Sequence, residues 1–143
     1  MGKFEKLHKK QRHPNVAKGV IISEIVFYRY PLLRILMVKT EGKKILFLGD
    51  AYAATCKNAI ANYGDRLDCD IVQVAHHAVN GGSVALYKAA GAKLYLIPNN
   101  REPVEKAKKK DSVVYWIVNN APEMVFAGDG TEYFYLAQPL EGQ

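Results

Sequence analysis

The sequence predicts an α/β fold, a mixed β-sheet with flanking helices, from the order of its apolar segments. Two apolar runs of strand length, Lys44–Leu48 and Ile71–Ala75, are separated by the alanine-rich segment Tyr52–Tyr63, which has helical length and is followed by Gly64. A strand–helix–strand unit of this kind forms a parallel pair of strands with a right-handed crossover. Further strands joined by short turns precede and follow this unit, so we expect a mixed sheet.

Two strands joined by a hairpin are expected at the N-terminal side of this unit. The segment Val20–Tyr30 is rich in β-branched and aromatic residues, which favour strands, and Pro31 interrupts it. Arg34–Thr40 and Lys44–Leu48 flank the short turn 41–43, in which Gly42 supplies the positive φ of a tight turn.

Helices and strands are expected to alternate after residue 52. The apolar residues of Tyr52–Tyr63 fall on one helical stripe, as expected for a helix that packs on a sheet. Ser83 is a suitable N-cap for the short helix Val84–Ala90, and Gly91 is suited to end it.

The remaining elements follow from composition and turn signals. Composition allows residues 112–119 to be strand or helix, and their place in the alternation favours a helix. The predicted elements are the strand Lys93–Ile97, the helix Ser112–Asn119, and the hairpin strands Glu123–Ala127 and Thr131–Ala137 around Gly128-Asp129-Gly130.

The chain divides into a basic arm, residues 1–18, and one folded domain, residues 19–143. Its 143 residues, 49% hydrophobic and 24% charged, are ordinary for a soluble globular domain. The arm holds six Lys or Arg residues against one Glu, a balance of +5, so only +1 of the net charge of +6 belongs to the other 125 residues. A basic arm is most often solvated, and the alternative is an arm that binds nucleic acid.

No membrane or secretory segment is expected. No apolar run approaches the roughly 20 residues that span a bilayer, and no apolar core follows the basic start. Cys56 and Cys69 do not make a disulfide framework, and reduced thiols predict a cytoplasmic protein.

Ionisable residues follow both strands of the parallel unit. Asp50 comes after the first strand and His76-His77 after the second. Parallel strands end at the same edge of a sheet, where open α/β sheets bind ligands. Neutral imidazole is a common ligand of transition metals. If strand geometry persists, neighbouring side chains point to opposite faces, so one histidine faces Asp50 and the other packs behind it. The sequence does not decide which, and the alternative is that backbone groups satisfy both histidines.

The segment Lys44–Asn100 resembles the C-terminal half of a metallo-β-lactamase-fold hydrolase. It is most similar to the hydrolase-like domain of bacterial DNA-uptake (competence) channel proteins. Gly49-Asp50 matches the Gly-Asp pair whose carboxylate bridges two metal ions in that family, and His76-His77 matches its His-His-Gly ligand motif. The pattern continues through Asn80-Gly81-Gly82 and Leu86-Tyr87.

This resemblance, which runs from about Ile22 to Tyr135, implies a metal-dependent hydrolase of phosphodiester, ester or amide bonds. It implies zinc, or else manganese or iron, as the cofactor. The implied metal ligands are Asp50, His76 and His77, and Asp50 and His77 are the implied catalytic residues.

The sequence also departs from the family pattern. The family's principal motif, His-x-His-x-Asp-His, belongs to the N-terminal half and does not occur, and the other two histidines, His8 and His13, lie in the basic arm. A binuclear zinc site needs several ligands on each metal, so one copy of this chain carries only part of a site. Ala78 stands where a glycine usually follows the histidine pair, and a Cβ there is strained if φ is positive.

The resemblance therefore predicts half of an αββα sandwich that is inactive or incomplete as a single chain. The chain is then a fragment, a degenerate paralogue or one half of a split enzyme. Half a sandwich leaves one sheet face to be covered, which predicts a homodimer or a partner chain that supplies the missing half. The alternative is a non-catalytic module that binds a protein or nucleic acid through its basic arm.

Overall fold

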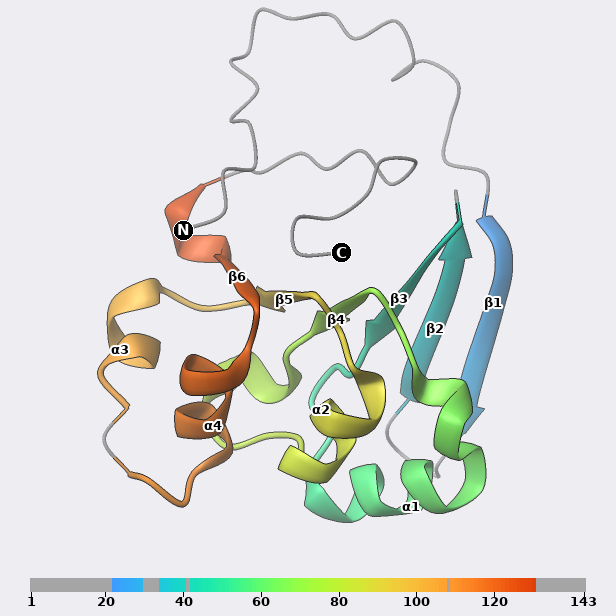
Figure 1. Ribbon diagram of the computed structural model, residues 1–143, viewed down its shortest axis with the longest axis horizontal. Coiled ribbons are helices and arrows are strands. Elements are labelled where there is room, and N and C mark those ends of the chain that lie inside the picture. The colour runs from blue at the N-terminus through green and yellow to red at the C-terminus, as the bar shows by residue number, and fades with distance from the viewer. Residues whose placement is uncertain (1–21, 30–33, 41, 108, 131–143) are drawn as a thin grey trace, which may run out of the picture.

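The fold is built on a six-stranded sheet with the strand order β1-β2-β3-β4-β5-β6 (Figure 1). The structure, a computed structural model, describes residues 22–29, 34–40, 42–107 and 109–130. The basic arm and the predicted strand Thr131–Ala137 lie outside these residues. The strands are β1 (Ile22–Arg29), β2 (Arg34–Thr40), β3 (Lys43–Phe47), β4 (Ile71–Gln73), β5 (Leu94–Ile97) and β6 (Glu123–Phe126).

The sheet is mixed, which confirms the predicted α/β class. β1, β2 and β3 pair in antiparallel order, and β3, β4, β5 and β6 pair in parallel. The hairpin between β2 and β3 closes with Thr40 opposite Lys43, and Gly42 has the predicted positive φ of 74°.

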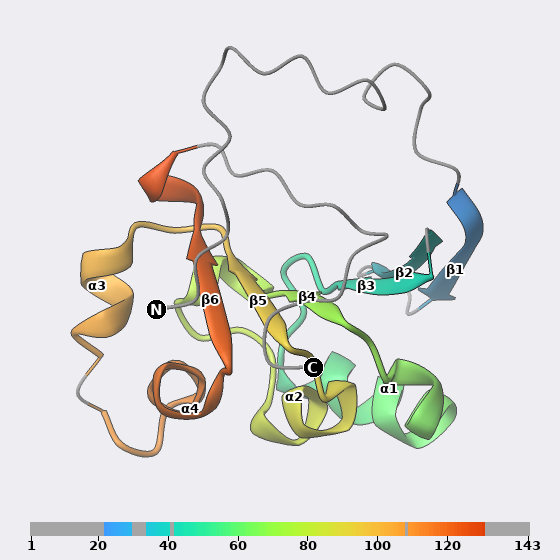
Figure 2. The same cartoon turned by 45° about the horizontal axis from the view of Figure 1, so that its top comes forward.

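Three helices cover one face of this sheet: α1 (Ala53–Tyr63), α2 (Val84–Ala90) and α4 (Val113–Asn120) (Figure 2). The shorter α3 (Arg101–Glu105) precedes α4. Ser83 Oγ caps α2 by accepting from Leu86 N at 3.2 Å, and Gly91 ends that helix in the left-handed conformation, as predicted. Ser112 Oγ caps α4 in the same way, and this confirms the helix expected over residues 112–119.

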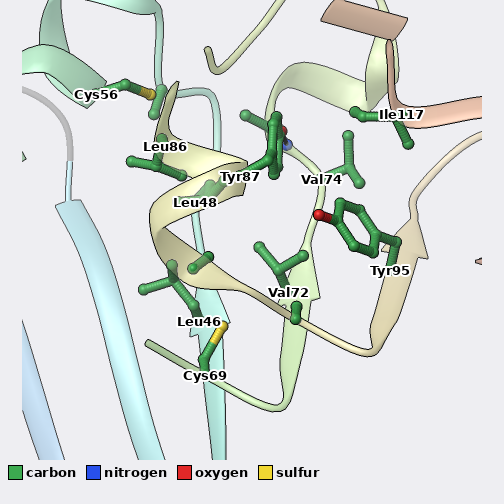
Figure 3. Close-up of a cluster of buried hydrophobic side chains, with 14 of the residues drawn as sticks. Leu46, Leu48, Cys56, Cys69, Val72, Val74, Leu86, Tyr87, Tyr95 and Ile117 are labelled. Atoms are coloured by element: carbon green, nitrogen blue, oxygen red, sulfur yellow. Dashed lines mark hydrogen bonds between the residues drawn. The ribbon is translucent and has the colours of Figure 1, made fainter. Parts of the chain in front are cut away.

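The main core lies between the sheet and these helices. Alternate residues of the strands point into it, because side chains of a strand alternate between the two faces. The core includes Leu46, Leu48, Cys56, Cys69, Val72, Val74, Leu86, Tyr87, Tyr95 and Ile117 (Figure 3).

The opposite face of the sheet is also apolar. Ile71 and Leu94 are buried there, and Ile45, Leu96 and Val125 pack against them half-buried. Within the described part of the chain, no helix lies over this face (Figure 2). The sheet therefore has two apolar faces and described helices on one of them.

The second parallel strand is shorter than predicted, and this corrects the expectation for residues 71–75. Val74 N still donates to Leu96 O of β5 at 2.8 Å, but Ala75 N donates to the hydroxyl of buried Tyr87 at 3.0 Å. Because a side chain takes the next backbone donor, the strand ladder stops. The chain then enters a 3-10 turn, Ala75–Ala78, that contains both histidines.

Candidate functional site

Asp50 lies at the carboxyl end of β3, where a side chain from β4 fixes the backbone. Gln73 Oε1 accepts hydrogen bonds from Leu48 N at 3.1 Å and from Gly49 N at 2.9 Å. Gly49 has a φ of 53°, and a glycine adopts this left-handed conformation without the strain that a Cβ causes. This turn leaves the Asp50 side chain 57% exposed at the edge of the sheet.

The two histidines follow β4 in an unusual backbone conformation. His76, His77 and Ala78 have φ values of 48°, 53° and 56°, all in the left-handed region that residues with a Cβ rarely adopt. Neighbouring chain segments hold this turn. His76 N donates to Gly49 O at 2.9 Å, and Asn99 Nδ2 donates to His77 O at 2.7 Å.

The premise that strand geometry continues through the histidines is therefore wrong. Even so, the two imidazoles point to different partners. His77 Nε2 lies 3.7 Å from Asp50 Oδ1, and the His77 side chain is 63% exposed.

The second imidazole, His76, has a partner at each ring nitrogen. His76 Nδ1 lies 2.7 Å from Asn80 Oδ1, and His76 Nε2 lies 3.1 Å from the hydroxyl of Tyr52. The amide oxygen of Asn80 is an acceptor only, so Nδ1 carries the proton and Nε2 accepts from Tyr52. Both ring nitrogens of His76 are thus hydrogen-bonded to other side chains, and it is His77 that faces Asp50.

The facing atoms of Asp50 and His77 fit one metal ion. Zinc binds carboxylate oxygen and imidazole nitrogen at roughly 2.0–2.2 Å, so two donors 3.7 Å apart subtend an angle of about 120° at a shared ion. That angle is close to the tetrahedral value that zinc prefers. The separation of these two atoms is therefore compatible with two ligands of a tetrahedral site.

The three predicted ligands do not form one cluster. Over the residues that the structure describes, no group of three or more His, Cys, Asp or Glu side chains is arranged to hold a metal ion. The histidine that faces Asp50, which the sequence left open, is His77, whereas His76 is engaged with Tyr52 and Asn80. Of the three residues, only Asp50 and His77 thus lie close together in the described part of the chain.

The loop after the histidines packs tightly against them. A Cβ added at Gly81 would lie 2.3 Å from His76 Cβ, and one at Gly82 would lie 2.7 Å from the hydroxyl of Tyr87. Gly82 N donates to Ala51 O at 2.7 Å, which links this loop to the turn that carries Asp50. The Gly81-Gly82 pair is therefore needed for the close approach of the two loops.

Sequence reasoning missed the side chains that position the site. These are Tyr52, Gln73, Asn80 and Asn99. A signal existed for Gln73, because it is the one polar residue in the run 71–75, and for Asn99, because it closely follows a strand. The role of Tyr52 has no sequence signal, since it depends on the left-handed turn at His76.

The two cysteines are buried and are protonated at neutral pH. Burial raises the pKa of Cys56 to about 11 and the pKa of Cys69 to about 12. Both thiols are free and buried. The thiolate is the form that binds metals, so neither residue is suited to that role, and both belong to the buried core.

Three further carboxylates near strand ends and turns have structural partners. Asp68 forms an ion pair with Lys44 Nζ at 2.6 Å, and Asp70 accepts from Lys44 N at 2.8 Å. Asp129 accepts from Arg101 at 2.6 and 3.0 Å. These contacts give Asp68, Asp70 and Asp129 structural roles at turns and strand ends.

Comparison with models of known protein families gives no match, and comparison with curated proteins gives none either. In the described part of the chain, each helix is too short or too polar to cross a bilayer. The case for a function therefore rests on the geometry of the sheet edge and on the sequence motifs.

Proposed function

We propose that this chain is a metal-dependent hydrolase-superfamily domain of the metallo-β-lactamase type that carries part of a metal site. The observation that supports the proposal is the 3.7 Å separation of Asp50 Oδ1 and His77 Nε2 at the carboxyl edge of a parallel sheet. Both residues fall on the Gly-Asp and His-His positions of the family pattern.

Asp50 and His77 would hold the ion, with zinc as the favoured metal because one carboxylate and one imidazole suit it. A bound zinc ion would supply a water of lowered pKa for hydrolysis. Gln73 holds the turn that carries Asp50, and Asn99 holds the backbone of His77. These residues preset the distance between the two ligands before a metal binds.

The missing ligands come from a second chain under this proposal. Two donors leave a tetrahedral shell half filled, and zinc in proteins takes four ligands. The apolar face of the sheet, with Ile45, Leu96 and Val125 only half-buried, supports a covering layer contributed by that chain. A single chain is therefore expected to have little or no hydrolytic activity.

Zinc retention tests the site. The protein is loaded with zinc, freed of excess metal by gel filtration and analysed by elemental mass spectrometry. We expect Asp50→Asn and His77→Gln to lose zinc, and His76→Gln to retain it because His76 is engaged elsewhere. Asp111→Asn is the matched control, since it removes an exposed carboxylate remote in sequence from the edge. Equal zinc in wild type and in Asp50→Asn would reject the site.

Self-association is tested separately by light scattering over a range of protein concentrations. We expect a mass that rises toward twice the chain mass, or that rises when a partner chain is added. Substituting half-buried Ile45 or Val125 by Asp is expected to shift the equilibrium toward the monomer, because a charge on an apolar interface is costly. A monomer that persists at every concentration, with and without zinc, would contradict the homodimer.

A further inference from the structure

Asp50 and His77 lie at an exposed edge of the sheet, where a second molecule can reach them. Their facing atoms are 3.7 Å apart, and the two side chains are 57% and 63% exposed. Zinc in structural sites takes four protein ligands in a tetrahedral arrangement. Two copies of the same pair make up this number, because they bring two carboxylates and two imidazoles. A second copy of this chain is therefore sufficient to complete the shell of one ion.

The charge of the pair favours a shared ion over direct contact between two chains. Two Asp50 carboxylates that approach each other across an interface repel. Imidazole binds zinc as a neutral group, so the two positive charges of one ion balance the two carboxylates. Association of two copies at this edge is therefore expected to depend on zinc.

Exposed apolar side chains gather around the same pair. In the described part of the chain, the large apolar residues that stand exposed are Phe47, Tyr52 and Val79, at 36%, 46% and 62%. Each of them lies within three positions of Asp50 or His77 in the sequence. Single apolar residues on a surface are ordinary, whereas a group at one edge marks an interaction surface. We call these three residues the apolar rim.

The apolar rim is continuous with the sheet face that no described helix covers. Phe47 follows Ile45 by two positions along the chain, and residues two apart in a strand share a face. Register partners in four neighbouring strands extend this row beside the edge: Phe47, Gln73, Leu96 and Val125. The sheet face and the edge thus form one surface that a second copy can cover.

The position of the two-fold axis decides whether two copies can share an ion. Aligned sheets pack face to face about 10 Å apart, with their strand directions within about 30° of each other. An axis that runs between the sheets along the strands brings both carboxyl edges to the same end. An axis across the strands places these edges at opposite ends. Only the first arrangement lets two identical ligand pairs meet on the axis of a closed dimer.

We propose that two copies of this chain share one zinc ion on such an axis, held by Asp50 and His77 of each copy. The inference rests on the metal pair of the proposed function and names the second chain as a further copy of this one. Zinc sites with four protein ligands are structural, whereas catalytic sites keep one position for water. The shared ion is therefore expected to join the two chains and to leave no place for a hydrolytic water.

The ratio of zinc to protein tests the inference. The full chain is loaded with zinc, freed of excess metal by gel filtration, and measured by light scattering and by elemental mass spectrometry. We expect one zinc ion for every two chains and twice the mass of one chain. In a buffer with free zinc at about 100 times its dissociation constant, we expect dimerisation to be about 100-fold stronger than with a chelator.

Variants separate the shared site from other sources of zinc binding. Asp50→Asn and His77→Gln are each expected to lose the ion and the zinc-dependent dimer together. The double variant His8→Gln, His13→Gln is expected to keep both, because it removes only the two histidines of the basic arm. Loss of the ion in this double variant would assign it to the arm and overturn the inference. Circular dichroism checks that each variant is folded.

Val79 tests the part of the apolar rim in the interface. Val79→Lys brings like charges of the two copies near each other, so it is expected to weaken the zinc-loaded dimer at least about tenfold. Ala61→Lys is the matched control, because Ala61 is exposed on α1, on the face of the sheet that the helices cover (Figure 2). It is expected to leave the dimer unchanged. Equal strength of the two variant dimers would contradict an interface at this edge.

The same measurements distinguish failure of this inference from failure of the proposed function. One zinc ion per chain, in a monomer or in a dimer, would overturn the shared site and leave the proposed metal pair standing. A zinc-loaded monomer whose mass increases only when a different chain is added would do the same. Equal zinc in wild type and in Asp50→Asn, or no zinc in either, would reject the metal pair itself.

Discussion

At the scale of single residues, the left-handed turn His76-His77-Ala78 decides how the two histidines are used. In a continuing strand, adjacent imidazoles would point to opposite faces of the sheet. The turn instead sends His77 toward Asp50 and His76 toward Tyr52 and Asn80. Two identical neighbours thus acquire different chemical surroundings.

The left-handed backbone of this turn is expected to lower the stability of the folded protein at Ala78, where it can be measured. A left-handed φ costs a residue with a Cβ about 1–2 kcal/mol, whereas removing a buried methyl group costs about 0.8 kcal/mol. Ala78 has a φ of 56° and is 6% exposed, so Ala78→Gly is expected to raise the free energy of unfolding by about 0.5 kcal/mol. Urea denaturation of wild type and Ala78→Gly measures this difference in the free energy of unfolding.

Ala90→Gly is the matched control, because Ala90 is also buried but lies in helix α2. There the same substitution removes a buried methyl group and adds the cost of a helical glycine, so it is expected to lower the free energy of unfolding by about 1–2 kcal/mol. Losses of similar size at both positions would show that the backbone at Ala78 is not strained.

Gln73 holds the end of β3 through two hydrogen bonds to one oxygen atom. Gln73→Leu leaves Leu48 N and Gly49 N without this acceptor, which is expected to lower the free energy of unfolding by about 1–3 kcal/mol. Gln73→Glu keeps an acceptor at the same place, so it is expected to lower the free energy of unfolding by less. Chemical denaturation of both variants measures the two decreases. Equal decreases would show that the side-chain oxygen of residue 73 does not stabilise the end of β3.

At the scale of elements, two loops must approach closely to build the site. A Cβ at Gly81 would meet His76 Cβ at 2.3 Å, so Gly81→Ala is expected to cost up to about 3 kcal/mol and to move His76. Gly91→Ala is the control, because its φ is also positive at 57° but nothing lies within 4 Å. It is expected to cost about 1 kcal/mol.

Nuclear magnetic resonance of the imidazole nitrogens provides a second measurement on these two variants. Gly81→Ala is expected to shift the His76 signals, and Gly91→Ala is expected to leave them unchanged. If the His76 signals are the same in both variants as in wild type, Gly81 does not pack closely against His76.

The elements were largely predictable from the sequence because local signals agree with the fold. Ser83 and Ser112 cap the helices that they precede, and Gly42 closes the hairpin. The end of β4 was not predictable. It depends on a hydrogen bond from Ala75 N to the hydroxyl of Tyr87, twelve residues away. No local sequence pattern predicts this hydrogen bond. The positions of Asp50 and His77 followed from topology, whereas the partners of His76 followed from that unpredicted turn.

At the scale of the whole molecule, buried acidic groups predict a loss of stability at high pH. The pKa of Cys56 rises to about 11 and that of Cys69 to about 12, mainly because burial disfavours the thiolate. An exposed thiol in the unfolded chain has a pKa of about 8.5, so the unfolded state loses its protons first. The free energy of unfolding is therefore expected to be constant below about pH 8.5 and to fall as pH rises toward 11–12.

Denaturation at a series of pH values measures this effect. Replacing Cys56 and Cys69 by alanine is the control, and it is expected to reduce the decline between about pH 8.5 and 9.5, where unfolded tyrosines, with a pKa of about 10, are still mostly protonated. Burial also raises the pKa of Tyr95 to about 12, so a decline at higher pH is expected to remain. An identical profile in both proteins would show that the thiols do not contribute.

The whole molecule also combines the facing side chains of Asp50 and His77 with a second apolar sheet face. Both features support the proposal that a second chain completes the site. Either feature by itself would have a simpler explanation, because exposed ion pairs and apolar surface are common in soluble proteins.

Under the proposed function, Asp50 and His77, and not His76, bind the metal ion. The most direct measurement follows the imidazole nitrogens of both histidines by nuclear magnetic resonance while zinc is added. We expect the Nε2 signal of His77 to shift strongly and the nitrogen signals of His76 to stay unchanged. A shift of the His76 nitrogens instead, or no shift at either histidine, would contradict the proposed site.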